Sequence, residues 1–155
     1  YNVFKKRIGE TIDRARNIVD TAYIAAVEKG LAGMDDAVRF LAKEMEAGRI
    51  QEVYAVATPL QHSFRMLAHA WMHLWSMSIC VPKLKEIAGD AGGDAIRSLA
   101  GDNGEAAFYY GKLLSSRFFL GSEFRKYFGL LESVISGERA VVESFDQTFT
   151  GALEG

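Results

Sequence analysis

The sequence predicts an all-α protein, and specifically an antiparallel four-helix bundle with short loops and a C-terminal tail. Apolar residues recur at steps of three and four along most of the 155 residues, which is the spacing of one helix face. We find no stretch that alternates apolar and polar residues as a strand does. Breaks rich in glycine separate the periodic stretches, and only two prolines occur. We therefore expect a single helical domain over residues 1–155.

The first helix is expected over residues 3–28, where charged residues surround one apolar stripe. Glycine accepts the left-handed backbone conformation that commonly ends a helix, so Gly30 and Gly33 are expected to end this one. A second, shorter helix is expected over residues 35–48, because the two aspartates that open it complement the helix dipole. The stripe of the first helix consists of Phe4, Ile8, Ile12, Ala15, Val19, Ala22 and Ala26.

The third helical region is expected to begin near Ile50 and to contain a break. Pro59 removes a backbone donor and is expected to bend or restart the helix. The apolar pattern becomes dense after this proline, so the main part of the helix follows it. Pro82 is expected to bend the helix a second time before Gly89 ends it.

Residues 89–104 are rich in glycine and aspartate and form the clearest predicted loop, with a single helical turn over residues 95–99. Asp102 is expected to cap the fourth helix, which runs to about Ile135. Gly137 marks the end of that helix. A weaker amphipathic tail follows, which contains Val141, Val142, Phe145 and Phe149.

The fourth helix opens with the stretch AAFYYGKLLSSRFFL, residues 106–120. It holds five aromatic rings, one lysine and one arginine. Its apolar residues cover a wide arc, which is typical of a helix that packs against more than one neighbour. We expect the rings between Phe108 and Phe128 to point inward and to form the core, rather than to line a ligand site.

Composition argues against several classes of function. Eighteen basic and twenty acidic residues give a net charge of -2, and the one dense basic group, residues 5–7, is soon followed by Glu10 and Asp13. Nucleic acid is therefore not an expected partner. Residues 66–81 are apolar but fall short of the roughly 20 residues that a membrane span needs, so we expect a buried helix there. The single cysteine, Cys80, favours a reducing compartment such as the cytoplasm.

The sharpest chemical pattern is a stripe of soft donor side chains spaced for one face of the third helix, namely His62, Met66, His69, His73, Met77 and Cys80. Such donors bind copper, zinc or nickel, but only His69 and His73 are histidines one helical turn apart. Ala70 stands where a zinc-protease helix has glutamate, and no Glu-x-x-His motif of di-iron bundles occurs. We expect histidines that form hydrogen bonds in or at the rim of the bundle, with a metal site as the alternative.

No catalytic residue is predicted. Cys80 lies beside Val81 and Pro82, and such apolar surroundings do not activate a thiol. The chain contains no G-x-S-x-G elbow and no glycine-rich phosphate loop. Arg117 stands beside Phe118 near the edge of the apolar face, where an unpaired charge is costly. We expect Arg117 to pair with a carboxylate on another helix or to contact a partner domain.

The stretch EAAFYYGKLLSSRFFL resembles the last helix of the C-terminal helical domain of certain bacterial acyl-CoA dehydrogenase-like flavoproteins. The preceding region is similar too, with a third helix interrupted at Pro59, a tryptophan at Trp71, and a loop rich in glycine and aspartate. The resemblance covers most of the chain and is strongest over residues 50–135. The positions that carry it in the last helix are Phe108, Tyr109, Lys112, Arg117 and Phe118.

The resemblance implies a C-terminal piece of a larger enzyme, in which a carboxylate takes the α proton of an acyl-CoA and FAD accepts the β hydride. In that family the base, the flavin site and the thioester site lie in preceding domains, so no catalytic or cofactor residue carries over. The implied partners are the catalytic domains of the same chain and, where the enzyme is a homodimer, its second subunit. Two alternatives stay open. One is a free-standing metal-binding bundle that uses His69 and His73, and the other is an interaction domain that exposes Phe119, Phe145 or Phe149.

Overall fold

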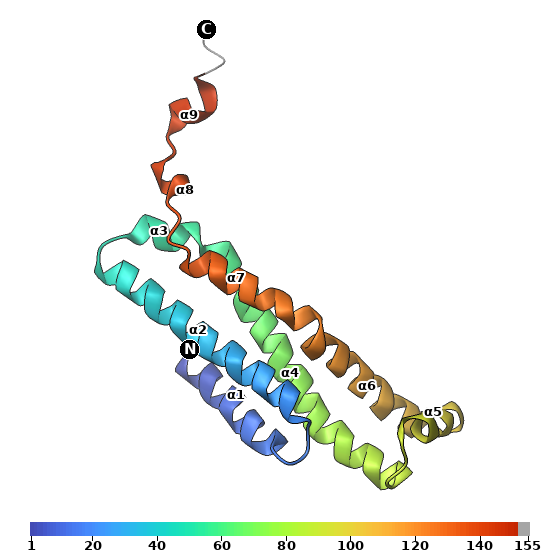
Figure 1. Ribbon diagram of the computed structural model, residues 1–155. Coiled ribbons are helices and arrows are strands. Elements are labelled where there is room, and N and C mark those ends of the chain that lie inside the picture. The colour runs from blue at the N-terminus through green and yellow to red at the C-terminus, as the bar shows by residue number, and fades with distance from the viewer. Residues whose placement is uncertain (152–155) are drawn as a thin grey trace.

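The computed structural model describes residues 1–151, and within them the fold is all-α, without a strand (Figure 1). This confirms that the protein is all-α, as predicted. The helices are α1 (Asn2–Ala15), α2 (Thr21–Glu46), α3 (Ile50–Ala55), α4 (Ala57–Ala88), α5 (Gly93–Asp102), α6 (Gly104–Gly121), α7 (Lys126–Ile135), α8 (Ala140–Glu143) and α9 (Asp146–Thr150), with a 3-10 turn η1 (Glu123–Arg125) between α6 and α7.

The long helix α4 lies at the centre of the packing. It contacts α1, α2, α6 and α7, and these helices run lengthwise beside one another in Figure 1. The short helix α5 packs on α6 at one end of the body, and α3 lies at the other end. From that second end, α8 and α9 lead away from the body. The tail therefore adds little to the core.

The first predicted helix boundary is wrong. Helix α1 ends at Ala15, and the turn that follows places Asn17 at φ 65°, a conformation that asparagine tolerates better than most residues. Asp20 then caps α2, its carboxylate accepting a hydrogen bond of 2.8 Å from the backbone N–H of Ala22. The predicted stripe of residues 4–26 is real but is divided between two helices, because a turn of a few residues preserves the apolar spacing on both sides.

Gly30 and Gly33 lie inside α2 and do not end it, and the two aspartates at 35 and 36 are also within this helix. The glycines are needed for close packing. A Cβ on Gly30 would stand 2.6 Å from Cζ of Phe124, and one on Gly33 would stand 2.7 Å from Cδ1 of Leu131. Side chains of η1 and α7 therefore reach the backbone of α2 at these two positions, as glycine permits.

The third helical region divides at Val56, three residues before the expected proline. Pro59 lies in the first turn of α4, where its missing N–H is not needed. Helix α4 continues through Pro82 to Ala88 and ends at Gly89, whose φ is 62°. The predicted end at Gly89 is thus confirmed.

The segment after α4 holds more helix than predicted, since α5 extends beyond the single expected turn. Asn103, and not Asp102, caps α6: its Oδ1 accepts hydrogen bonds of 3.0 Å from the backbone N–H groups of Glu105 and Ala106. The predicted fourth helix is interrupted at Ser122, so that it forms α6, η1 and α7. Gly137, at φ 68°, follows α7 as expected.

The core is formed by apolar side chains from α1, α2, α4 and the segment α6–α7. Buried polar groups within it are paired: the indole N–H of Trp71 donates to Oγ1 of Thr11 at 2.7 Å, and the hydroxyl of Tyr127 donates to the carbonyl of Gly30 at 2.8 Å. None of the helices within residues 1–151 combines the length and apolarity that crossing a membrane requires. Residues 66–81 instead lie within α4 of the packed body.

Candidate functional site

The residues that carry the family resemblance lie on α6 and do not all point inward. Phe108 and Phe118 leave 58% and 64% of their surface exposed, and Lys112 and Arg117 are exposed too, whereas Tyr109 is half-buried. The prediction that every ring between Phe108 and Phe128 belongs to the core is therefore wrong for two of them. The apolar arc of α6 is wider than its neighbours can cover, so one edge of it faces outward.

The outer face of α6 consists of Phe108, Gly111, Leu114, Ser115 and Phe118, all of which are exposed. The small residues Gly111 and Ser115 lie between the larger apolar ones along the helix. The opposite side of the helix supplies the buried residues Ala106, Ser116 and Leu120. Helix α6 thus has one side in the core and one apolar side without a partner in residues 1–151. Contiguous exposed apolar surface of this kind is typical of an interaction site.

The two cations of α6 are placed differently from the prediction. No ion pair involves Arg117 within residues 1–151, so the expected interhelical salt bridge is not found there. Because Arg117 is exposed, its charge is solvated and needs no carboxylate. Lys112 places its Nζ 5.5 Å from the centroid of the Phe108 ring, a cation–π contact at the edge of the outer face.

The donor stripe of α4 is divided between the surface and the core. His62 and His69 are exposed, His73 is half-buried, and Met77 and Cys80 are buried. Of the three histidines, His69 and His73 both meet the ring of Phe119, which stacks on His73 at a centroid distance of 4.6 Å and meets His69 edge-on at 5.9 Å. The stripe therefore provides one pair of neighbouring histidines beside α6.

These two histidines line a groove of about 260 Å³ between α4 and α6, which we call the α4–α6 groove. Its walls are His69, Met72, His73 and Ser76 from α4 and Lys112, Ser115 and Ser116 from α6. Nδ1 of His73 lies 3.1 Å from Oγ of Ser116, so this histidine forms a hydrogen bond at the rim of the body, as the sequence predicts. The pKa of His73 is lowered by burial, and further by the charges of His69 and Lys112.

The groove does not have the ligands of a metal centre. Within residues 1–151, no three side chains of the types His, Cys, Asp and Glu come together in a way that would hold a metal ion. His69 and His73 would be two ligands of one helix, and Lys112 would place a positive charge beside the metal. The contribution of α6 to the groove has a sequence signal, since Lys112, Ser115, Ser116 and Phe119 fall at helical spacing on one face.

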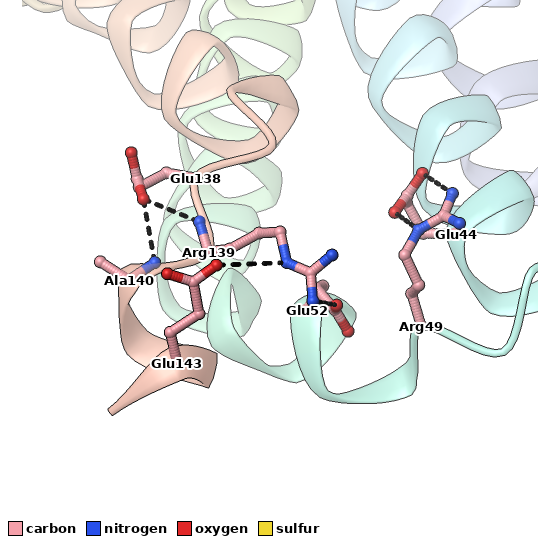
Figure 2. Close-up of polar contacts among 7 residues, drawn as sticks. All are labelled: Glu44, Arg49, Glu52, Glu138, Arg139, Ala140 and Glu143. Atoms are coloured by element: carbon pink, nitrogen blue, oxygen red, sulfur yellow. Dashed lines mark hydrogen bonds and ion pairs between the residues drawn. The ribbon is translucent and has the colours of Figure 1, made fainter. Parts of the chain in front are cut away.

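A second hollow, of about 320 Å³, lies at the end of the body near α3, between apolar residues of α2 and α7 and a charged rim. In this rim Arg49 pairs with Glu44, with Nη2 at 2.6 Å from Oε1 (Figure 2). This guanidinium hydrogen bond holds the pKa of Glu44 below its usual value. The arginine is thus already occupied by a carboxylate.

The other arginine of this rim connects α8 to α3. Figure 2 shows Arg139 between two carboxylates, 3.3 Å from Glu52 and 3.8 Å from Glu143. Glu138 accepts hydrogen bonds from the backbone N–H groups of Arg139 and Ala140 and so supports the start of α8. Both arginines of this rim are paired with carboxylates, so their ion pairs join α2, α3 and α8 at this end of the body.

Comparison with known families decides what kind of chain this is. A family model described as acetyl-CoA dehydrogenase C-terminal like matches residues 4–144. The chain belongs to this family. The matched residues of this acyl-CoA dehydrogenase C-terminal-like domain run from α1 to the end of α8, and they include the outer face of α6 and the α4–α6 groove. Helix α9 lies beyond the match. No curated protein and no solved structure matches the chain.

Proposed function

We propose that this chain is the C-terminal accessory domain of an FAD-dependent acyl-CoA dehydrogenase. It packs on the catalytic domains of the same polypeptide and supports the structure of the subunit or of its dimer. The carboxylate base, the FAD and the acyl-CoA thioester belong to those other domains, and the residues of this chain take no part in the chemistry. We further propose that its packed body is an antiparallel four-helix bundle and that the enzyme is cytoplasmic.

The observation that carries this proposal is the outer face of α6, which lies within the family match. Phe108 and Phe118 each expose more than half of their surface, and Leu114 exposes 44%. Covering such side chains contributes about 1.5 to 3 kcal/mol for each fully buried ring. The aromatic rings of this face and the exposed Arg117 at its edge are of residue types that are enriched in protein interfaces.

The experiment compares the complete polypeptide that the gene encodes with the 155-residue chain alone. We expect the complete polypeptide to bind one flavin per chain and to reduce an electron-accepting dye in the presence of an acyl-CoA. We expect the 155-residue chain to bind no flavin and to reduce no dye. Flavin binding or dye reduction by the 155-residue chain, or a complete polypeptide without flavin, would refute the proposal.

A pair of variants then tests the face itself. Phe118→Asp places a charge in the outer face of α6, whereas Tyr54→Asp places one on α3, where the tyrosine is 73% exposed. In the complete polypeptide we expect Phe118→Asp to lower the thermal midpoint and Tyr54→Asp to leave it unchanged. In the 155-residue chain both changes are expected to lower the free energy of unfolding by no more than about 1 kcal/mol. Equal effects of the two variants in the complete polypeptide would show that the outer face is not covered.

A further inference from the structure

We propose that the α4–α6 groove binds an oxyanion of the phosphate class, held by Lys112 of α6 together with His69 and His73 of α4. The groove adjoins the outer face and shares Ser115 with it, but the binding of an anion does not depend on the packing of that face.

The groove is lined by groups that donate hydrogen bonds. Lys112 brings an ammonium, His69 and His73 bring imidazoles, and hydroxyl groups come from both helices. Not one carboxylate is among its lining residues. A concave surface with cationic and hydroxyl donors and no acid is suited to an anion, because charge-assisted hydrogen bonds to phosphate oxygens are the strongest contacts it can make.

The internal hydrogen bonds of the groove leave donors available. Nδ1 of His73 is engaged with Ser116, which leaves Nε2 as the second hydrogen-bonding atom of the ring. The hydroxyl of Ser115 is already used as a donor to the carbonyl of Gly111 at 3.0 Å, so the available donors are those of the imidazoles and of Lys112. The ammonium of Lys112 has no carboxylate partner within residues 1–151, and its one aromatic contact, with Phe108, does not use up its three N–H donors.

The positive charges around the groove favour an anion over a metal ion as its ligand. Burial is the main cause of the lowered pKa of His73, and the charged groups that lower it further are His69 on its own helix and Lys112 on the facing helix. A cation in the groove would meet the same repulsion, whereas an anion would relieve it. The ring of Phe119, stacked on His73, excludes water from one side and so strengthens the attraction between an anion and these groups.

The size of the groove fits a small ligand. Its volume of about 260 Å³ is below the range of roughly 300 to 1,000 Å³ that cofactor and drug sites occupy. It is several times the volume of one water molecule, about 30 Å³. A phosphate group, free or carried at the end of a larger molecule, is therefore the ligand class that matches both the charge and the space.

The experiment follows the imidazole resonances of the 155-residue chain by NMR during titration with inorganic phosphate at constant ionic strength. The chain has three histidines, and the exposed His62 on the same helix serves as an internal reference outside the groove. We expect saturable shifts of the His69 and His73 resonances, with the resonances of His62 unchanged. Sulfate keeps two charges from about pH 6 to pH 8, and its affinity is expected to rise as the pH falls and His73 becomes protonated.

Two variants remove the same charge from different places. Lys112→Met is expected to weaken phosphate binding roughly tenfold, the loss of one charge-assisted contact. Lys6→Met removes a lysine of α1 whose side chain is 77% exposed and is expected to leave binding unchanged. Phe108→Leu, which keeps Lys112 and removes the ring beside it, is also expected to leave binding unchanged.

Titration with glycerol 3-phosphate identifies the source of the ligand. Tighter binding of this ester than of inorganic phosphate would support an organic phosphate, and weaker binding would support free phosphate. Equal, non-saturable shifts at all three histidines would overturn the proposal, as would equal effects of Lys112→Met and Lys6→Met. Saturation of His69 and His73 by zinc but not by phosphate would also overturn it, in favour of a metal site.

Discussion

The rings of α6 and the rings of the segment η1–α7 are alike in chemistry and opposite in exposure. Phe108 and Phe118 are more than half exposed, whereas Phe124 and Tyr127 leave 1% and 0% of their surface exposed. Phe124 and Tyr127 both contact Gly30 of α2. The ring of Phe124 packs against this glycine, and the hydroxyl of Tyr127 donates a hydrogen bond to its carbonyl. The comparison teaches that the surface opposite a ring, and not the number of rings in the helix, decides whether the ring is buried.

The largest effect is expected where a ring from each region is removed. Phe124→Ala should lower the free energy of unfolding by about 3 to 5 kcal/mol, because it leaves a cavity against α2. Phe118→Ala should lower it by less than about 1 kcal/mol in the 155-residue chain, since most of its ring is in water. Urea unfolding followed by circular dichroism measures both values. Similar losses of stability in the two variants would show that the two rings do not differ in burial.

The next largest change in stability is expected at Gly30, which leaves room for the buried ring of Phe124. Gly30→Ala should destabilise the chain by about 1 to 3 kcal/mol, because the added methyl group would stand 2.6 Å from Phe124. Gly129→Ala is the matched control: it lies inside α7, and beyond the adjacent backbone of that helix nothing described lies within 4 Å of an added Cβ. This second change should stabilise the chain by about 0.5 to 1 kcal/mol. Thermal unfolding of the two variants should therefore shift in opposite directions, and a stabilising Gly30→Ala would contradict the account.

A smaller effect isolates the hydrogen bond between the two segments. Tyr127→Phe removes the hydroxyl that donates to Gly30 and leaves the ring in place, so it should cost about 1 kcal/mol. Burial raises the pKa of Tyr127, so this hydroxyl stays protonated at neutral pH. Tyr54→Phe, at an exposed tyrosine of α3, should cost nothing measurable. Calorimetry of the two variants makes the test, and a loss that is equal for both would show that this bond does not stabilise the fold.

The smallest effect on stability is expected for the ion pair and hydrogen bonds of Asp35, which join α1 to α2. They are polar and partly exposed, unlike the buried ring contacts. Burial alone would raise the pKa of Asp35, but hydrogen bonds from Lys5 and Tyr1 outweigh it and hold the pKa below its usual value. A lowered pKa stabilises the fold above the unfolded value near 3.8, and this contribution is lost as the pH falls through the folded pKa.

The comparison of Asp35→Asn with the unchanged chain gives the measurement. The loss of stability at pH 7 should be about 0.5 kcal/mol, because water screens these partly exposed charges. It should decline toward zero below about pH 3. A difference between the two proteins that does not change with pH would mean that the charge of Asp35 has no part in holding α1 to α2.

Much of the fold could be predicted from the sequence, because helical periodicity and end signals are local. The helix ends at Gly48, Gly89 and Gly137 are confirmed, and each of these glycines has a positive φ. Gly30 and Gly33 have the same residue type but serve close packing, which depends on a segment almost a hundred residues away. A sequence pattern cannot separate these two uses of glycine.

The candidate site was only partly predictable for the same reason. The pairing of His69 with His73 follows from helical spacing, but their position beside Lys112 depends on how α4 packs against α6. The width of the apolar arc of α6 was visible in the sequence, whereas the side of it that stays uncovered was not. The arc could be assigned to the core or to a partner only after the neighbours of α6 were placed.

The central claim, that the catalytic domains cover the outer face of α6, is tested most directly by side-chain footprinting with hydroxyl radicals. The oxidation rates of Phe108 and Phe118 are measured in the 155-residue chain and in the complete polypeptide, with the exposed Tyr54 as the reference. We expect both phenylalanines to become protected severalfold in the complete polypeptide while Tyr54 keeps its rate. Unchanged oxidation of Phe108 and Phe118 would contradict it.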